Sequence, residues 1–306
     1  MIAILQLGTI DYATGLALQQ QLVTLRKEEK IGDVLLLLEH NPVITLGRNA
    51  KAANIIASPE LLAQRGVELF ECDRGGDVTF HGPGQIVGYP IFDLRGHARS
   101  SDLPSRTEEN DSKNRSLPSR ESASGVRKHL GVIEFVRRLE EVLIRTCTDF
   151  AIPTKRVPGL TGVWTDPNIS ALPNSPSSRA PNSLSFRAEE DDLKNRYLES
   201  RNLLFAGAAP NAASESKLAA IGVHISRSVT SHGFALNVNT DLTYFNLIVP
   251  CGITTKPVTS MQQQLARELD LNAVSESISR NFGVVFESQM LWLETLDALL
   301  SQTSES

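Results

Sequence analysis

The sequence predicts a single α+β domain with a mixed or antiparallel central sheet flanked by helices. Three observations lead to this prediction. Short β-branched segments outnumber amphipathic helical ones, and the two kinds do not alternate strictly as they would in a βαβ protein. Two polar stretches, the 30 residues of 96–125 and the 50 residues of 166–215, leave 226 of the 306 residues, which is the size of one domain.

Eight segments have the composition of strands, because they are short, rich in β-branched residues and bounded by Gly, Pro or Asn. In chain order they are 2–7, 34–39, 43–46, 67–72, 77–80, 86–94, 218–225 and 233–238. Helical spacing of apolar residues covers about 12–29, 59–65, 126–150, 259–268 and parts of 274–300. In 126–150 charged residues lie opposite an apolar stripe; the stripe is Leu130, Ile133, Val136, Leu139 and Leu143, and the charged residues are Arg137, Arg138, Glu140 and Glu141.

The stretches 96–125 and 166–215 are predicted to be long disordered loop insertions within one domain of residues 1–306. The first has four apolar residues and eight serines, and the second is rich in Ser, Pro, Asn and Ala, so neither buries enough surface to offset its ordering entropy. The segments 103–120 and 184–201 are identical at 11 of 18 positions. We interpret this as one element inserted twice, because a solenoid would repeat throughout the chain.

Charge and cysteine content exclude several classes of protein. A net charge of −5, from 30 basic and 35 acidic residues, differs from that of a basic nucleic-acid-binding protein. The longest aliphatic run, 34–38, is too short to span a membrane, and no basic segment precedes the apolar residues at the start. The three cysteines lack zinc-site spacing and an even count, which favours a reducing compartment. We expect a cytoplasmic protein that binds no metal, nucleic acid or membrane.

The densest unusual segment is RGGDVTFHGPGQIVGY, residues 74–89. Its five glycines remove side chains where the backbone turns or approaches a ligand, and Arg74 and His81 place polar groups beside them. One interpretation is the wall of a close-fitting ligand site. The other is a hairpin whose glycines only permit tight turns. It is not a phosphate-binding loop, because GxxxxGK[ST] is absent.

A second group of polar candidates lies between residues 217 and 251. Lys217 opens an apolar strand, where loss of hydration favours the neutral amine that can act as a base, although such a lysine is often simply solvated. Cys251 lies in VPCG, where Gly252 leaves room for a substrate beside the sulfur of a nucleophile; an inert buried cysteine is the alternative. His232 in SHGFALNV is a third candidate, or a histidine bonded to backbone at a strand end.

Taken together, the ordered motifs resemble the lipoyl (octanoyl) transferase family, which is related to biotin and lipoate protein ligases. The resemblance covers nearly all of the chain outside the insertions, in HNPVITLGR (40–48), RGGDVTFHGPGQIVGYPIFDL (74–94), GVWT (162–165), SKLAAIGVHI (216–225), SHGFALNV (231–238) and FNLIVPCGI (245–253). It implies a biotin/lipoate protein ligase-like fold. The chain departs from the family at the insertions and at Asp77 and Phe80, where many relatives have Gln and Tyr.

The resemblance implies an acyltransferase in which Cys251 carries the acyl group as a thioester and Lys217 ionises that cysteine. The family's substrate-contacting positions correspond to Arg74, Gly75, Gly76, Asp77, Val78, Thr79, Phe80, His81, Ala220, Ile221, Gly222, Gly233, Phe234 and Ala235. The implied reaction moves an octanoyl group from octanoyl-acyl carrier protein to a lysine of lipoyl domains in 2-oxoacid dehydrogenases or of the glycine-cleavage H protein. We expect no cofactor and a monomer. Backbone N–H groups near Gly252 or in the Lys217 strand are our expectation for the oxyanion site.

Three other functions remain open from the sequence. An ATP-dependent lipoate-protein ligase would activate a free acid and would need no cysteine nucleophile, so the cysteine in VPCGI argues against it. A thioester hydrolase would use Cys251 with His232 and pass the acyl group to water. A non-enzymatic module that binds acyl chains would turn over no thioester.

Overall fold

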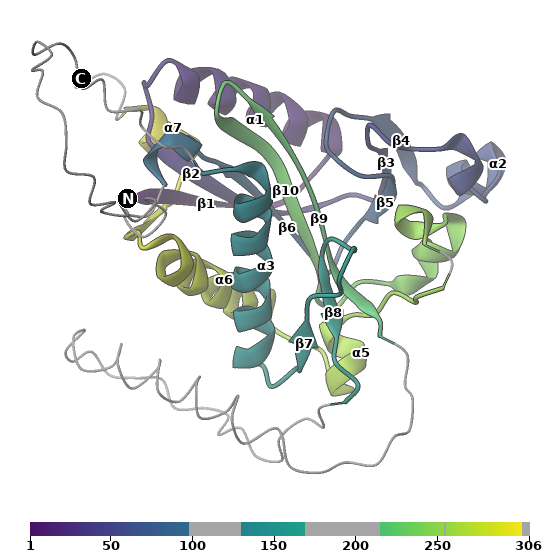
Figure 1. The fold of residues 1–306 in the computed structure, drawn as a ribbon. Helices are drawn as coiled ribbons and strands as arrows, with labels where there is room; N and C mark the ends of the chain where they lie inside the picture. The colour runs from purple at the N-terminus through teal and green to yellow at the C-terminus, as the bar shows by residue number, and fades with distance from the viewer. Residues whose placement is uncertain (98–129, 169–214, 254, 302–306) are drawn as a thin grey trace, which may run out of the picture.

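The computed structural model describes residues 1–97, 130–168, 215–253 and 255–301 (Figure 1). Most of each predicted insertion, 98–125 and 169–214, lies outside the described residues. The two ends of the stretch 166–215 are described and contact the rest of the protein. Lys155 forms ion pairs with both Asp166 (3.3 Å) and Glu215 (2.9 Å). Residues 166–168 and 215, at the two ends of this stretch, are therefore part of the described structure.

Within the described residues, eight strands form the main sheet in the order β11-β1-β2-β6-β10-β9-β8-β7. Their bounds are β1 (Ile2–Ile10), β2 (Asp33–His40), β6 (Gln85–Ile91), β7 (Thr154–Lys155), β8 (Val163–Thr165), β9 (Lys217–Ser226), β10 (Val229–Asn237) and β11 (Met290–Leu293). β1 pairs in parallel with β11 and β2, and every other pair of neighbours is antiparallel. The predicted mixed sheet is therefore confirmed.

A smaller sheet has the order β4-β3-β5, with β3 (Val43–Leu46) between β4 (Glu68–Glu71) and β5 (Val78–His81). β3 is parallel to β4 and antiparallel to β5. The segment 74–89 thus passes from one sheet to the other, because β5 belongs to the small sheet and the next strand, β6, to the main sheet. It does not form the hairpin that was the alternative interpretation, since β5 pairs with β3 and β6 pairs with β2 and β10.

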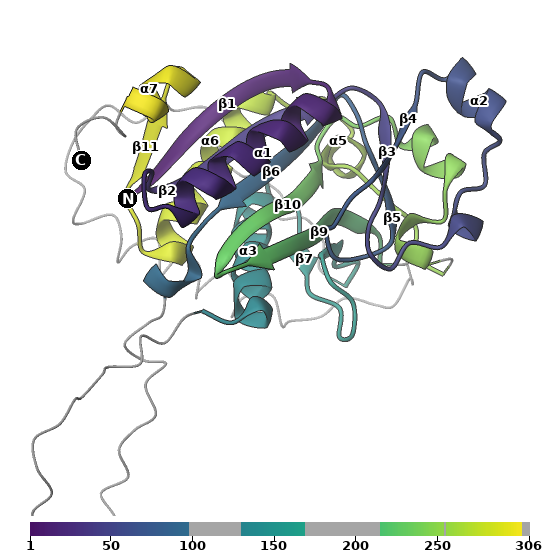
Figure 2. The ribbon, with the colours of Figure 1, turned by 90° about the horizontal axis from the view of Figure 1, so that it is seen from above.

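Helices cover both faces of the main sheet (Figure 2). α1 (Tyr12–Lys27) lies across one face, where Leu22 joins an apolar cluster with β1, β2 and β6. α3 (Val132–Asp149) and α6 (Leu271–Phe286) pack together on the other face and contribute Phe135, Leu139 and Phe282 to the largest cluster. The remaining helices are short: α2 (Pro59–Gln64), α5 (Met261–Leu265) and α7 (Leu296–Ser301). No helix in the described ranges has the length and apolar character needed to cross a bilayer.

The sequence prediction missed three strands and misplaced some helix ends. β7 and β8 have two and three residues, which is too short for a periodic pattern. β11 interrupts the region 274–300, because Glu287 takes a left-handed conformation that ends α6 and allows the chain to return beside β1. α5 likewise ends at Ala266, which has a φ of 53°, before the end of the predicted segment 259–268.

Two charged residues that were assigned to the polar side of α3 are buried. Arg138 is buried, and Glu140 has no solvent exposure. Glu140 accepts hydrogen bonds from the Gly162 amide (3.1 Å), from Arg137 (2.6 Å) and from Arg156 (3.1 Å). A buried carboxylate is stable only with such partners. This one fixes the loop that leads into β8.

We expect Glu140→Ala to lower the free energy of unfolding by about 2–3 kcal/mol, since it leaves the buried Gly162 amide without an acceptor and removes two ion pairs. Glu140→Gln should recover part of this loss. Urea unfolding measures both, with the partly exposed Glu141→Ala as the control, for which the expected loss is about 1 kcal/mol or less. A Glu140→Ala loss no larger than that of the control would contradict a structural role for this carboxylate.

Candidate active site

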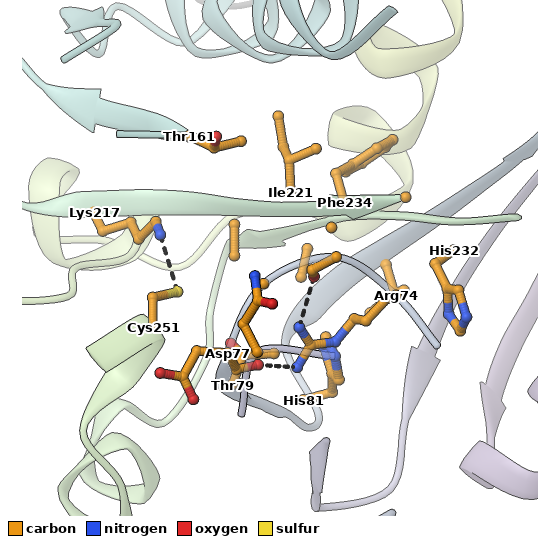
Figure 3. Close-up of a pocket in the computed structure, with 18 of the residues that line it drawn as sticks. Arg74, Asp77, Thr79, His81, Thr161, Lys217, Ile221, His232, Phe234 and Cys251 are labelled. Carbon is orange, nitrogen blue, oxygen red and sulfur yellow. Dashed lines mark hydrogen bonds between the residues drawn. The ribbon is translucent and has the colours of Figure 1, made fainter. Parts of the chain in front are cut away.

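A cavity of about 420 Å³ lies where the segment 74–81 meets β9 and β10 (Figure 3). Twelve of the fourteen positions predicted to contact substrate line it, together with Lys217, His232 and Cys251. These twelve are Arg74, Gly75, Gly76, Asp77, Thr79, His81, Ala220, Ile221, Gly222, Gly233, Phe234 and Ala235. The structure therefore brings together residues that are widely separated in the sequence.

Val78 and Phe80 point away from the cavity. Successive side chains of a strand face opposite sides, so Thr79 and His81 line the cavity while their neighbours pack beneath it. Val78 and Phe80 are 0% and 1% exposed, and the Phe80 ring stacks on Tyr244 at 4.7 Å between ring centres. Their side chains therefore lie in the core of the small sheet and do not line the cavity, unlike the other twelve predicted positions.

Residues outside the predicted set complete the wall. They are Tyr12, Asn49, Lys51, Val87, Tyr89, Gly159, Leu160, Thr161 and Ile253. Several lie within three residues of a recognised motif: Asn49 and Lys51 come after HNPVITLGR, and Leu160 and Thr161 come before GVWT. Adjacency to these motifs is the signal that could have found them.

Glycine is required where the segment 74–81 crosses β9. The Gly75 amide donates to the Val223 carbonyl (3.0 Å), and a Cβ atom on Gly222 would lie only 2.6 Å from the Gly75 oxygen. Real Cβ atoms do not come this close to backbone. The two backbones can therefore touch only because residue 222 has no side chain.

Gly222→Ala is expected to reduce the activity of this site by about a hundredfold, because a shift of about 1 Å between these backbones misplaces the cavity wall. Gly75→Ala is the matched control at the same crossing: its Cβ would lie 3.3 Å from the Val223 oxygen, so a small adjustment accommodates it. Steady-state kinetics of the two variants make the comparison. Equal losses in both would show that the close approach at Gly222 is not what shapes the site.

Lys217 and Cys251 form a hydrogen bond of 3.1 Å from Nζ to Sγ at one end of the cavity (Figure 3). Lys217 is the first residue of β9 and is 8% exposed. Its amide donates to the Pro257 carbonyl (2.8 Å), and its own carbonyl accepts from the Thr259 amide (2.9 Å). Its ammonium lies 5.1 Å from the centre of the buried Trp164 ring, a cation–π contact that also holds the side chain.

Cys251 occupies a strained backbone conformation in the short 3₁₀ turn Pro250–Gly252. Its φ and ψ of 55° and 19° lie in the left-handed region, which residues with a side chain seldom adopt. The Gly252 amide closes the turn by donating to the Val249 carbonyl (3.0 Å). The N–H groups of Gly252 and Lys217 are thus already bonded within the protein, so the oxyanion site that we expect near Gly252 or in the Lys217 strand would use neighbouring donors.

His232 faces a different partner from Cys251. Its Nε2 atom lies 2.7 Å from an Asp73 oxygen, and its amide donates to Gln19 (2.7 Å). Burial lowers the pKa of His232 although Asp73 opposes this effect. The His232 side chain is therefore hydrogen-bonded to Asp73. The sulfur of Cys251 instead accepts a hydrogen bond from Lys217. This arrangement favours Lys217 over His232 as the partner of the nucleophile.

His81 is a buried, neutral histidine. Gln85 donates through its amide nitrogen to Asn237 (2.8 Å), so its oxygen accepts from Nδ1 of His81 (2.7 Å). Burial, followed by the charges of His40 and Arg74, lowers the pKa of His81 to about 3. The folded protein therefore binds this proton much less readily than the unfolded chain.

This difference predicts that the stability of the protein falls on mild acidification. An unfolded histidine has a pKa of about 6.5, so protonation favours the unfolded state as the pH drops below 6.5 towards 3. Between about pH 7 and pH 5, the titration of His81 is expected to lower the free energy of unfolding by about 2 kcal/mol. Urea unfolding at the two pH values measures it, and His81→Gln should lose correspondingly less. An unchanged pH dependence in His81→Gln would rule out this assignment.

The family model of the lipoyl protein ligase A/B catalytic domain matches residues 11–107 and 124–283. The chain belongs to this family. Among its relatives, an octanoyltransferase of Koribacter versatilis (strain Ellin345) is 52% identical over 300 residues, which cover 98% of this chain and 90% of that protein. An octanoyltransferase of Acidobacterium capsulatum is 46% identical over 301 residues, covering 98% and 96%.

Solved structures have the same fold at low sequence identity. The bi-partite lipoate protein ligase of Thermoplasma acidophilum aligns with a TM-score of 0.57 and 11% identity over 99% of this chain and 90% of that one. A lipoate-protein ligase A bound with ATP aligns with a TM-score of 0.54 and 11% identity, over 99% and 92%. The predicted lipoate protein ligase-like fold is confirmed by these similarities.

Proposed function

We propose that the protein is an acyltransferase that moves an octanoyl group, through a thioester on Cys251, to the lysine of an acceptor protein during protein lipoylation. The 3.1 Å contact between Lys217 Nζ and Cys251 Sγ at the end of the cavity carries this proposal. A free thiol has a pKa of about 8.5 and is mostly protonated at neutral pH, so a nucleophilic cysteine needs such a partner. Several relatives that are similar over nearly the whole chain are octanoyltransferases, which supports octanoyl as the acyl group transferred.

In the first half-reaction, the Cys251 proton resides on Lys217, and the thiolate attacks the carbonyl carbon of the donor thioester. The bond from that carbon to the donor sulfur breaks, and the donor sulfur takes a proton from the Lys217 ammonium. The products are the free donor thiol, an octanoyl thioester on Cys251 and a neutral Lys217 amine. The lysine is then ready to act as a base.

In the second half-reaction, Lys217 takes a proton from the ammonium of the acceptor lysine, because only a neutral amine is a nucleophile. The amine attacks the thioester carbonyl and loses a second proton to solvent. The carbon–sulfur bond breaks as the amide forms. The thiolate of Cys251 returns beside the Lys217 ammonium, and the net reaction releases one proton.

The proposal includes the partners of the reaction. We propose octanoyl-acyl carrier protein as the donor, and lipoyl domains of 2-oxoacid dehydrogenases and the glycine-cleavage H protein as acceptors. The solved relative from Thermoplasma acidophilum is described together with its E2 lipoyl domain, which supports this class of acceptor. A monomer with residues 1–306 as one catalytic domain is part of the proposal. So is a cytoplasmic location, with which three free cysteines agree.

The intact mass of the protein after incubation with octanoyl-acyl carrier protein tests the reaction class. We expect a single octanoyl adduct that hydroxylamine removes and that an apo lipoyl domain discharges, with the octanoyl group appearing on the domain. Release of free octanoate in place of octanoylated domain would indicate a hydrolase. Absence of any turnover would indicate an acyl-binding module.

A second measurement separates the transferase from a ligase of the same family. A lipoate-protein ligase would consume ATP and free octanoate, releasing pyrophosphate in step with acceptor modification. We expect no pyrophosphate from ATP and octanoate under conditions in which the thioester donor supports transfer. Pyrophosphate release coupled to modification of the acceptor would overturn the proposal in favour of the ligase.

A further inference from the structure

The turn that carries Cys251 is attached by backbone hydrogen bonds to a segment distant in the sequence, residues 54–57. The Val249 amide donates to the Asn54 carbonyl (2.7 Å), and the amides at positions 56 and 57 both donate to the Leu247 carbonyl (2.9 and 3.0 Å). A bridge between Ile55 and Ile248 completes this attachment. The position of residues 247–252 therefore depends on where Asn54 is held.

Asp77 holds Asn54. The Asn54 side-chain amide donates to Oδ2 of Asp77 at 2.6 Å, a short hydrogen bond to a carboxylate. The other oxygen of Asp77 accepts from the Val78 amide (2.8 Å) and the Lys51 amide (3.2 Å), which fixes the carboxylate in its orientation. All the described donors to this carboxylate are uncharged.

Asp77 also lies directly beside the turn that carries Cys251. A Cβ atom on Gly252 would lie 2.9 Å from Oδ2 of Asp77, so the turn packs directly on the carboxylate. Figure 3 shows Asp77 on the side of the cavity where Cys251 lies. The same oxygen thus contacts residue 252 directly and residue 249 through Asn54. Asp77 links the segment 74–81, which lines the cavity, to the turn that presents the sulfur.

Cys251 needs such support because its conformation is unfavourable. A residue with a side chain at a φ of 55° persists only where its surroundings determine its position. The Lys217 contact alone does not do this, since a lysine side chain has four rotatable bonds. An anchored turn holds Sγ at 3.1 Å from Nζ without relying on the lysine.

We propose that Asp77 and Asn54 form a positioning pair that sets the place of Cys251 relative to Lys217. This inference rests on the proposed function only in taking Cys251 as the reactive nucleophile. The pair acts through hydrogen bonding and not through the charge of Asp77 on a substrate. Reversing the donor and the acceptor should therefore preserve its action.

The pair can be reversed by two isosteric substitutions. Asn54→Asp places two carboxylates against each other and breaks the bond, whereas Asp77→Asn leaves an amide that a rotated Asn54 side chain can still bond. In the double variant, the amide of residue 77 donates to the carboxylate of residue 54, and its oxygen still accepts from Val78 and Lys51. We expect a severe defect in Asn54→Asp, a mild one in Asp77→Asn and recovery in the double variant.

The readout is the rate of alkylation of Cys251 by iodoacetamide, resolved by peptide mass and divided by the rate at Cys72 in the same sample. This ratio measures how far the Cys251 thiol is ionised and accessible to the reagent. The measurement needs no acyl donor or acceptor, so its outcome does not depend on whether the protein transfers octanoyl groups. We expect Asn54→Asp to lower it by about tenfold or more and the double variant to return it to within about threefold of the parent protein. The remote Asn272→Asp controls for adding a carboxylate.

Two results would overturn the inference. One is an unchanged ratio in a folded Asn54→Asp variant. The other is a lower ratio in Asp77→Asn that falls further in the double variant. That result would show that the charge of residue 77 matters and not the hydrogen bond. If Asn54→Asp does not fold, as judged by thermal unfolding, the cycle is repeated with Asn54→Ala and Asp77→Ala. Additive losses of Cys251 reactivity in that cycle would equally contradict a coupled pair.

Discussion

We expect Cys251→Ala to abolish both the octanoyl adduct and transfer to the acceptor, because in the proposed reaction its sulfur forms the bond to the acyl carbon. Loss of a covalent nucleophile leaves only catalysis by binding and orientation, so a fall of at least about 10³-fold in kcat is expected. Intact mass of the protein after exposure to the donor measures the adduct, and acceptor modification measures the transfer.

The two other cysteines are controls with different surroundings. Cys72 is partly exposed and donates a weak hydrogen bond to the Leu46 carbonyl, so Cys72→Ala should retain full adduct formation. Cys147 is 0% exposed within α3, and burial raises its pKa to about 12, which makes it an inert packing residue. Cys147→Ala should react normally with some loss of stability. An adduct that persists in Cys251→Ala would contradict the assignment of Cys251 as the nucleophile.

Lys217→Ala is the substitution with the second largest expected effect. In the proposed reaction Lys217 accepts the Cys251 proton and later the acceptor's proton, so we expect both half-reactions to slow by about 10²–10⁴-fold, as on removal of a general base. Single-turnover measurements follow adduct formation and discharge separately. Lys217→Arg keeps the positive charge but has no usable base, because guanidinium does not lose its proton in proteins. We expect it to form the adduct slowly and to fail at discharge.

Lys256→Ala is a matched control for Lys217. Its ammonium lies 5.7 Å from the centre of the same Trp164 ring and is paired with Glu215, while the sulfur of Cys251 is bonded to Lys217. Its removal should leave both half-reactions within severalfold of the parent protein. Wild-type behaviour of Lys217→Arg would show instead that charge suffices and that the general-base role is wrong.

The parts of the site that could be predicted from the sequence are those carried by long ordered motifs. The mixed sheet, the assembly of the segment 74–81 with β9 and β10, and the contact of Lys217 with Cys251 follow from them. The direction in which each side chain points depends on register, and a motif that covers a strand cannot separate Thr79 and His81, which line the cavity, from Val78 and Phe80, which do not.

Other features depend on contacts between distant segments. Glu140 belongs to the polar side of α3 by periodicity, yet it is buried because Gly162 and Arg156 come from a later loop to meet it. The three residues of β8 have no periodic signal and are defined by their pairing with β9. The bond from Asn54 to Asp77 joins residues 23 positions apart and is visible only in the folded chain.

The burial of Cys147 and the partial exposure of Cys251 make the thiols natural reporters of different openings of the protein. Cys147 lies between α3 and the main sheet, so a labelling reagent reaches it only when that face of the sheet separates from its helices. Cys251 is partly exposed in the native state, and we expect its reactivity to fall to that of an ordinary thiol when the turn moves away from Lys217. Labelling both in rising denaturant would order the loss of the reactive pair against the opening of the core in one unmodified chain.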